Sequence, residues 1–163
     1  MNLADEAQER VADALNAQGR STSHIATGLV ICMGLIAGTA AVAAIRPQPA
    51  APGAEPSRRP LIRAIWPALF SVTTLASLRV WNAPASRQRT NALGLWAVLQ
   101  ASNALMIFLK PRSAPGQVAA AMATAGLTSA YAHVAASVDQ RAAQMVAPTG
   151  FAGLAAIAAT PRK

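Results

Sequence analysis

The spacing of charged residues constrains this chain more than any other feature. Five stretches without Asp, Glu, Lys or Arg separate Arg20 from Arg46, Arg63 from Arg79, Arg89 from Lys110, Arg112 from Asp139 and Arg141 from Arg162. They hold 25, 15, 20, 26 and 20 residues. A helix rises about 1.5 Å per residue, so roughly 20 apolar residues cross the core of a bilayer. Only 12% of the residues are charged, about half the usual share in a soluble domain. The pattern argues against a soluble enzyme.

These stretches predict an all-α fold, an integral membrane bundle of five transmembrane helices. The expected spans are residues 25–45, 61–80, 90–109, 117–138 and 142–160, in a single domain from 23 to 163. The turns between them are short, so consecutive helices should be antiparallel neighbours. The second span has the shortest uncharged core, and Arg63 and Arg79 are expected to snorkel from its two ends to the lipid headgroups.

Residues 1–22 precede the first span and predict a short amphipathic helix over 2–18. Leu3, Ala7 and Val11 fall on one face, Asn2 can cap the start, and Gly19 can end the helix. Such a segment lies on the membrane surface, packs on a partner, or forms a mobile tail. The sequence leaves these three alternatives open.

The net charge of +8 indicates lipid contact rather than nucleic acid. The basic residues form small groups at the ends of the apolar stretches, whereas a nucleic-acid site would gather them on one face. The expected partner is therefore the lipid bilayer, with no nucleic acid. Five crossings place six Lys and Arg on the side of the N-terminus and eight on the side of the C-terminus. The positive-inside rule then favours an N-terminus outside and a C-terminus inside.

The first span contains Gly34 and Gly38 at the spacing of a GxxxG motif. This spacing lets two helix backbones approach closely in lipid. The contact could lie within the bundle or across a dimer, and glycine is also simply common in membrane helices.

The spans offer little chemistry for catalysis. No carboxylate lies inside them, Cys32 is the single cysteine, and His24 and His133 are the two histidines. No catalytic triad or hydrolytic metal site follows from these residues, so an enzyme is not expected. His133 could ligate a haem iron or hydrogen-bond across the bundle.

What the spans do offer is a lining of aromatic and carboxamide side chains. These are Trp66, Phe70, Trp96, Gln100 and Asn103. Such a lining suits a flat, apolar ligand with a few polar edges, and the alternative is ordinary helix packing. The carboxamides would be costly against lipid, so the face of Trp96, Gln100 and Asn103 should turn into the bundle.

Several short motifs, taken in order, resemble the translocator protein or tryptophan-rich sensory protein (TspO/MBR) family. Trp66-Pro-Ala-Leu-Phe70 is similar to the family's Trp-x-x-Leu-Tyr element, and Arg79-Val-Trp81-Asn-Ala-Pro resembles the end of the same helix in bacterial members. The stretch from Gln100 through Asn103 to Met106 is similar to the family's Gln-Leu-x-Leu-Asn-x-x-Trp element, with Met106 in place of the tryptophan. The segment from Val138 to Pro148 is similar to the family's entry into its fifth helix.

The resemblance implies a multi-pass protein, in a bacterial cell membrane, that is commonly a homodimer. It implies no required cofactor but a tetrapyrrole ligand such as protoporphyrin IX or haem, or in some members a sterol. Carried over by position, the ligand contacts would include Trp66, Asn103, Met106, Ala152 and Ala156. Since Met106 and Ala152 stand where the family has tryptophan, the light-dependent porphyrin degradation suggested for some members is not expected. The alternative function is a degenerate, non-catalytic membrane scaffold or interaction protein.

Overall fold

A computed structural model describes residues 2–45, 72–109 and 113–150. These residues form helices, with no strand among them. They are α1 (Leu3–Ala14), α2 (Thr22–Ile45), α4 (Arg87–Leu109), α5 (Ala114–Ala136) and α6 (Gln140–Val146), and residues 72–82 are also helical. The all-α prediction is therefore confirmed for this part of the chain.

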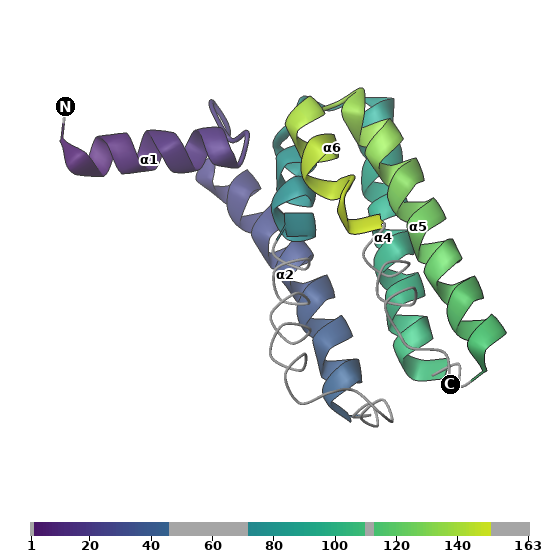
Figure 1. Cartoon of the computed structure of the whole chain (residues 1–163). Helices are drawn as coiled ribbons and strands as arrows, with labels where there is room; N and C mark the ends of the chain where they lie inside the picture. Colours follow the sequence, from purple (N-terminus) through teal and green to yellow (C-terminus); the bar gives the residue numbers. More distant parts are fainter. Residues whose placement is uncertain (1, 46–71, 110–112, 151–163) are drawn as a thin grey trace.

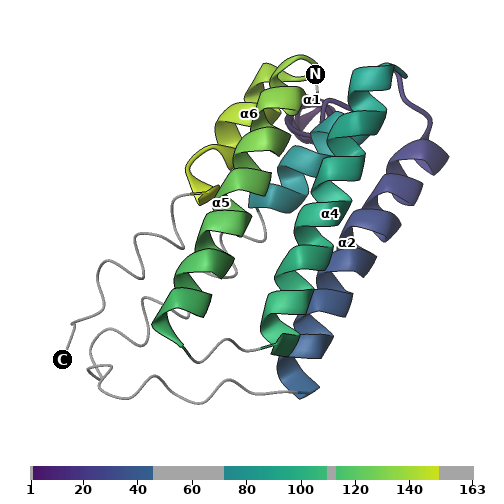
Figure 2. The ribbon, with the colours of Figure 1, turned by 90° about the vertical axis from the view of Figure 1, so that its right-hand side faces the viewer.

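The long helices pack side by side (Figures 1 and 2). Helix α4 contacts both α2 and α5, and α6 folds back against α5. Helix α1 instead projects sideways from one end of the bundle, where the 72–82 helix ends and α2, α4 and α6 begin. We call this the α1 end of the bundle.

The three long helices begin earlier than hydropathy predicts, because each start is capped by a serine. Ser21 Oγ accepts a hydrogen bond from the His24 backbone, Ser86 Oγ from that of Arg89 and Ser113 Oγ from that of Gly116. Such caps satisfy amide groups that the first helical turn leaves free. The predicted starts at 25, 90 and 117 move to Thr22, Arg87 and Ala114. Hydropathy identifies the apolar part of a helix, whereas the capping serines identify the residue at which the helical backbone begins.

The prediction for α1 was right in kind and too long at its end. Asn2 and Asp5 form the capping box of its first turn. The helix stops at Ala14 rather than at Gly19, because Asn16 already adopts a left-handed backbone with φ of 53°. Asn16 also donates through Nδ2 to the carbonyl of Arg79. A contact with the bundle therefore accompanies this earlier stop.

The start of the predicted fifth span, 142–160, is not one regular helix. Helix α6 begins after Asp139, whose carboxylate accepts the Ala142 amide, and it ends at Val146. Pro148 follows, and a proline lacks the amide needed to continue a helix. Residues 149 and 150 are helical again. The rest of this span and most of the second, 61–80, lie outside the described residues.

Within the described ranges, no helix combines the length and the hydropathy of a membrane span.

Candidate ligand-binding site

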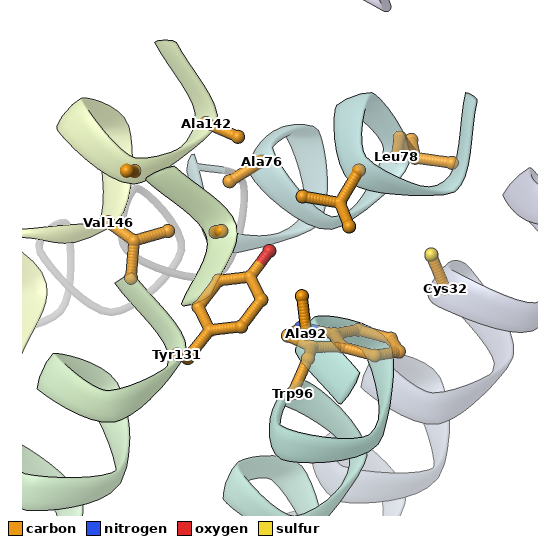
Figure 3. Packing of buried hydrophobic residues seen from close by; sticks show 11 residues of the cluster. Cys32, Ala76, Leu78, Ala92, Trp96, Tyr131, Ala142 and Val146 are labelled. Carbon is orange, nitrogen blue, oxygen red and sulfur yellow. The ribbon is translucent and has the colours of Figure 1, made fainter. Parts of the chain in front are cut away.

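The interior of the bundle is built around one aromatic side chain from each of α4 and α5. Trp96 on α4 is 2% exposed and stands beside Ala92, while Tyr131 on α5 is fully buried. Figure 3 shows the hydroxyl of Tyr131 pointing toward Ala76 of the 72–82 helix and Ala142 of α6. Small alanines at these positions leave room for the two large rings between the helices.

Three buried polar atoms in this interior have no hydrogen-bond partner among the described residues. They are Trp96 Nε1, Gln100 Oε1 and the hydroxyl of Tyr131. An unpaired polar group away from water costs about 1–3 kcal/mol. Native proteins keep few such groups, and each one calls for a reason. Here one N–H donor, one carbonyl acceptor and one hydroxyl lie unused on two neighbouring helices.

The predicted site residues on α4 are brought together on one side of that helix. Gln100 is buried, and Asn103 and Met106, one and two turns further on, are half-buried. Asn103 Oδ1 accepts a hydrogen bond of 3.4 Å from Thr124 of α5. The expectation that the carboxamides turn into the bundle is confirmed. Trp66, Phe70, Ala152 and Ala156 lie outside the described residues.

Tyr131 belongs to this interior, although the motifs did not single it out as a site residue. It is the chain's only tyrosine, and it stands in a helix of mostly small residues. A single phenol in an alanine-rich segment was the available signal. His133, two residues later, is exposed.

At the α1 end, Arg79 contradicts the expectation that it snorkels to lipid. Its side chain is 7% exposed, and Nη2 lies 2.9 Å from Oδ2 of Asp139, itself 6% exposed. Nη1 donates to the carbonyl oxygens of Asp13 and Ala14, both at 2.8 Å. The last carbonyls of a helix carry partial negative charge and lack partners within it. Because the last carbonyls of α1 and the carboxylate of Asp139 meet its guanidinium, Arg79 binds protein groups instead of headgroups.

A second set of contacts at the same end is centred on Trp81. The ring of His24 stacks on it with centroids 5.4 Å apart, and the guanidinium of Arg89 lies 5.3 Å from the ring centroid. Trp81 Nε1 donates to the carbonyl of His24 at 3.0 Å. Partial burial and the nearby guanidinium of Arg20 lower the pKa of Arg89 from its ordinary value. These contacts fasten the 72–82 helix to the starts of α2 and α4.

Glycine serves close packing at Gly28, not at the GxxxG motif. A Cβ added at Gly28 would lie only 2.6 Å from Trp81 Nε1. Gly34 and Gly38 are exposed, with open space where a Cβ would stand. The two GxxxG residues therefore make no close contact with the described bundle.

No group of three His, Cys, Asp or Glu that could hold a metal ion occurs among the described residues. Cys32 is buried and unpaired by any disulfide, with the Ser77 hydroxyl 3.4 Å from its sulfur. The chemistry that this interior offers is hydrogen bonding and aromatic contact.

Comparison with known proteins identifies the chain's relatives at the level of family. The model of the TspO/MBR family matches residues 26–159, which covers all but the ends of the chain. Neither the curated proteins nor the solved structures provide a match. The match includes the bundle and its buried interior and leaves out α1. The chain belongs to the TspO/MBR family, a family of membrane proteins.

Proposed function

We propose that this protein is a multi-pass membrane protein that binds a porphyrin-like or sterol-like apolar ligand inside its helical bundle. Its role would be tetrapyrrole handling, transport or sensing. The observation that carries the proposal is the set of unpartnered buried atoms on Trp96, Gln100 and Tyr131. A ligand with an apolar body and a few polar edges would use these atoms and offset their desolvation cost.

The exposed surface of the long helices supports the membrane part of the proposal. Large apolar side chains are exposed on α2, α4 and α5: Leu29, Val30, Ile31, Met33, Leu35, Val98, Leu105, Phe108, Leu109, Val118 and Met122. Soluble monomers rarely expose so many apolar residues along neighbouring helices, and lipid is the partner that such a surface fits. Five crossings, with the N-terminus outside and the C-terminus inside, remain part of this proposal.

The proposed ligand contacts combine the buried α4 face with residues before and after it. They are Trp66, Phe70, Gln100, Asn103, Met106, Ala152 and Ala156. Gln100 supplies the free acceptor, whereas the carboxamide of Asn103 already accepts from Thr124. Aromatic pairs contribute about 0.5–1.5 kcal/mol each beyond the burial of their area. With Met106 and Ala152 in place of tryptophans, we expect weaker tetrapyrrole binding than in tryptophan-rich relatives.

We further propose that binding occurs without turnover. Among the described residues no group of three His, Cys, Asp or Glu could hold a metal ion, and the thiol in this interior, Cys32, contacts the Ser77 hydroxyl. Illuminated protoporphyrin should then disappear no faster with the protein than with empty detergent micelles. Faster loss that depends on Trp96 would contradict this part of the proposal.

The ligand proposal is tested by titrating the purified protein with protoporphyrin IX while following tryptophan fluorescence. Gln100→Met removes the free carbonyl and keeps the side-chain length. One hydrogen bond is worth about 0.5–1.5 kcal/mol, so affinity should fall roughly 2–12-fold. Gln88→Met, at an exposed position on the same helix, is the control and should leave binding unchanged. Quenching that never saturates would contradict the ligand proposal. So would an affinity that is the same in Gln100→Met, in Trp66→Ala and in the unchanged protein.

A second candidate function is that of a membrane scaffold, and one observation favours it. Gly34 and Gly38 lie on a face of α2 where no described residue comes within 4 Å of a Cβ added at either position. A second copy or another membrane helix could approach closely there. This reading predicts association through α2 whether or not a ligand binds, and it includes the homodimer that we propose.

A further inference from the structure

Helix α1 has two opposite faces that the other described residues leave uncovered. Leu3, Ala7 and Val11 line one face, and Asp5 and Glu9 lie on the other. Leu3 is 83% exposed and Val11 57%. No residue of the helix is buried. Leu3 and Val11 lie two turns apart on one face of the helix, and an exposed apolar face of this kind is typical of a surface that contacts lipid or another protein.

Contacts at the end of α1 fix which way each face turns. Leu15, one turn after Val11 on the same side, packs against the buried core cluster of the bundle. Asp13, one turn after Glu9 on the opposite side, pairs with the exposed Arg141 at 3.2 Å. The apolar face of α1 is therefore on the same side of the helix as the bundle core. The acidic face is on the side of the α1 end.

The position of α1 matches the edge of the proposed lipid-facing surface. In Figure 1, α1 extends sideways from the bundle, across the direction of α2. Further along α2 stand the exposed apolar residues Val30 and Met33. If these face hydrocarbon, as the proposed function requires, α1 lies at the height where the membrane meets water. The apolar face of α1 then continues the lipid-facing surface of α2.

The charges of α1 select the kind of lipid surface. Asp5, Glu6, Glu9 and Asp13 oppose a single basic residue, Arg10. Helices that bind anionic membranes through charge carry Lys and Arg on their polar face instead. An acidic polar face gains nothing from an anionic lipid, so attachment must come from the apolar side chains.

We infer that α1 is an interfacial helix, with Leu3, Ala7 and Val11 buried in the headgroup region of a zwitterionic phospholipid membrane and Asp5 and Glu9 in water. The inference rests on the proposed function for the membrane embedding of α2. It adds a membrane contact outside the segment that matches the family. The hydrogen bonds of Arg79 to the last carbonyls of α1, and its ion pair with Asp139, hold α1 at the level of the membrane interface with its apolar face toward the lipid.

Site-directed spin labelling of the full chain in phosphatidylcholine vesicles tests the inference. In a Cys32→Ala background, single nitroxides are placed by Val11→Cys and Glu9→Cys, and by Val30→Cys on α2 as the reference. Collision rates with oxygen report on lipid, and those with a water-soluble nickel chelate report on water. The ratio of the two rates at position 11 should exceed that at position 9 several-fold and approach that at position 30. Adding phosphatidylserine should not increase it.

Each other outcome has a distinct meaning. Water exposure at position 30 would overturn the membrane proposal itself. Lipid exposure at position 30 with equal values at positions 9 and 11 would overturn the inference alone. Shielding of position 11 from both probes, increasing with the protein-to-lipid ratio, would show that a second copy covers the face and would overturn it too.

A chain that keeps Cys32 gives an independent readout. Val11→Glu should raise amide hydrogen exchange over residues 3–14 in the vesicles, because a carboxylate disfavours insertion. Glu9→Gln, on the opposite face, should not. Equal exchange in the two variants would overturn the inference.

Discussion

Arg79 of the 72–82 helix and Asp139 at the start of α6 form an ion pair in which both side chains are more than 90% buried. Arg79 also holds the carbonyls of Asp13 and Ala14, and Asp139 caps α6. One guanidinium thus links three helices at the α1 end. Such a pair is weak evidence for net stability, but removing one partner leaves a buried charge unpaired.

Arg79→Met should therefore destabilise the protein by about 3–5 kcal/mol, the usual cost of breaking a buried pair. Unfolding by denaturant in mild detergent measures it. Arg141→Met removes the exposed pair with Asp13 and should cost less than about 1 kcal/mol. Adding Asp139→Asn to Arg79→Met should recover part of the loss, since the asparagine keeps the cap and removes the charge. Equal costs for the two arginine variants would contradict this account.

Gly28→Ala should destabilise the fold by about 1–3 kcal/mol through overpacking. The added Cβ meets the ring of Trp81, which cannot move aside because His24 and Arg89 hold it. Gly94→Ala is the matched control, since open space surrounds that position. It should be neutral or stabilising by up to about 1 kcal/mol, the difference in helix propensity. Denaturant midpoints of the two variants should move in opposite directions or differ clearly in size.

Tyr131→Phe should separate stability from binding. The hydroxyl is buried, with no hydrogen-bond partner in the part of the chain that the structure describes, so its removal should raise the stability of the empty protein by about 1 kcal/mol. If a ligand uses the hydroxyl, affinity for protoporphyrin should fall several-fold in the same variant. His133→Ala, at an exposed position on the same helix, should change neither quantity. A variant that gains stability and keeps full affinity would show that Tyr131 does not contact the ligand.

If the proposed homodimer forms through Gly34 and Gly38, Gly34→Leu should disrupt it while leaving the fold of each chain intact. The position is open in the described bundle, so the leucine meets no side chain of its own protomer. Sedimentation in detergent should show a shift from dimer to monomer. Gly94→Leu, at an equally open position on α4, should leave the dimer unchanged. A dimer that persists in Gly34→Leu would exclude the GxxxG face as its interface.

The sequence by itself determined the helical class, the family and the main body of each described long helix. Helix formation depends on hydrogen bonds between residues four positions apart. The length of an apolar stretch and the serines that cap it are therefore local features that indicate a helix. The inward face of α4 also followed from sequence, because side chains at helical spacing share one side. The same reasoning found the two faces of α1.

Tertiary structure alone decided which residues meet. Arg79 was expected in lipid headgroups, and it is buried because it binds the last carbonyls of α1, from the far N-terminus, and the carboxylate of Asp139. Gly28 rather than Gly34 packs closely, since only the position of Trp81 distinguishes two glycines in one helix. The free hydroxyl of Tyr131 likewise depends on which helices surround it. Each of these features depends on a contact between segments that are distant in the chain. The spacing of residues within one helix does not predict which other segment that helix contacts.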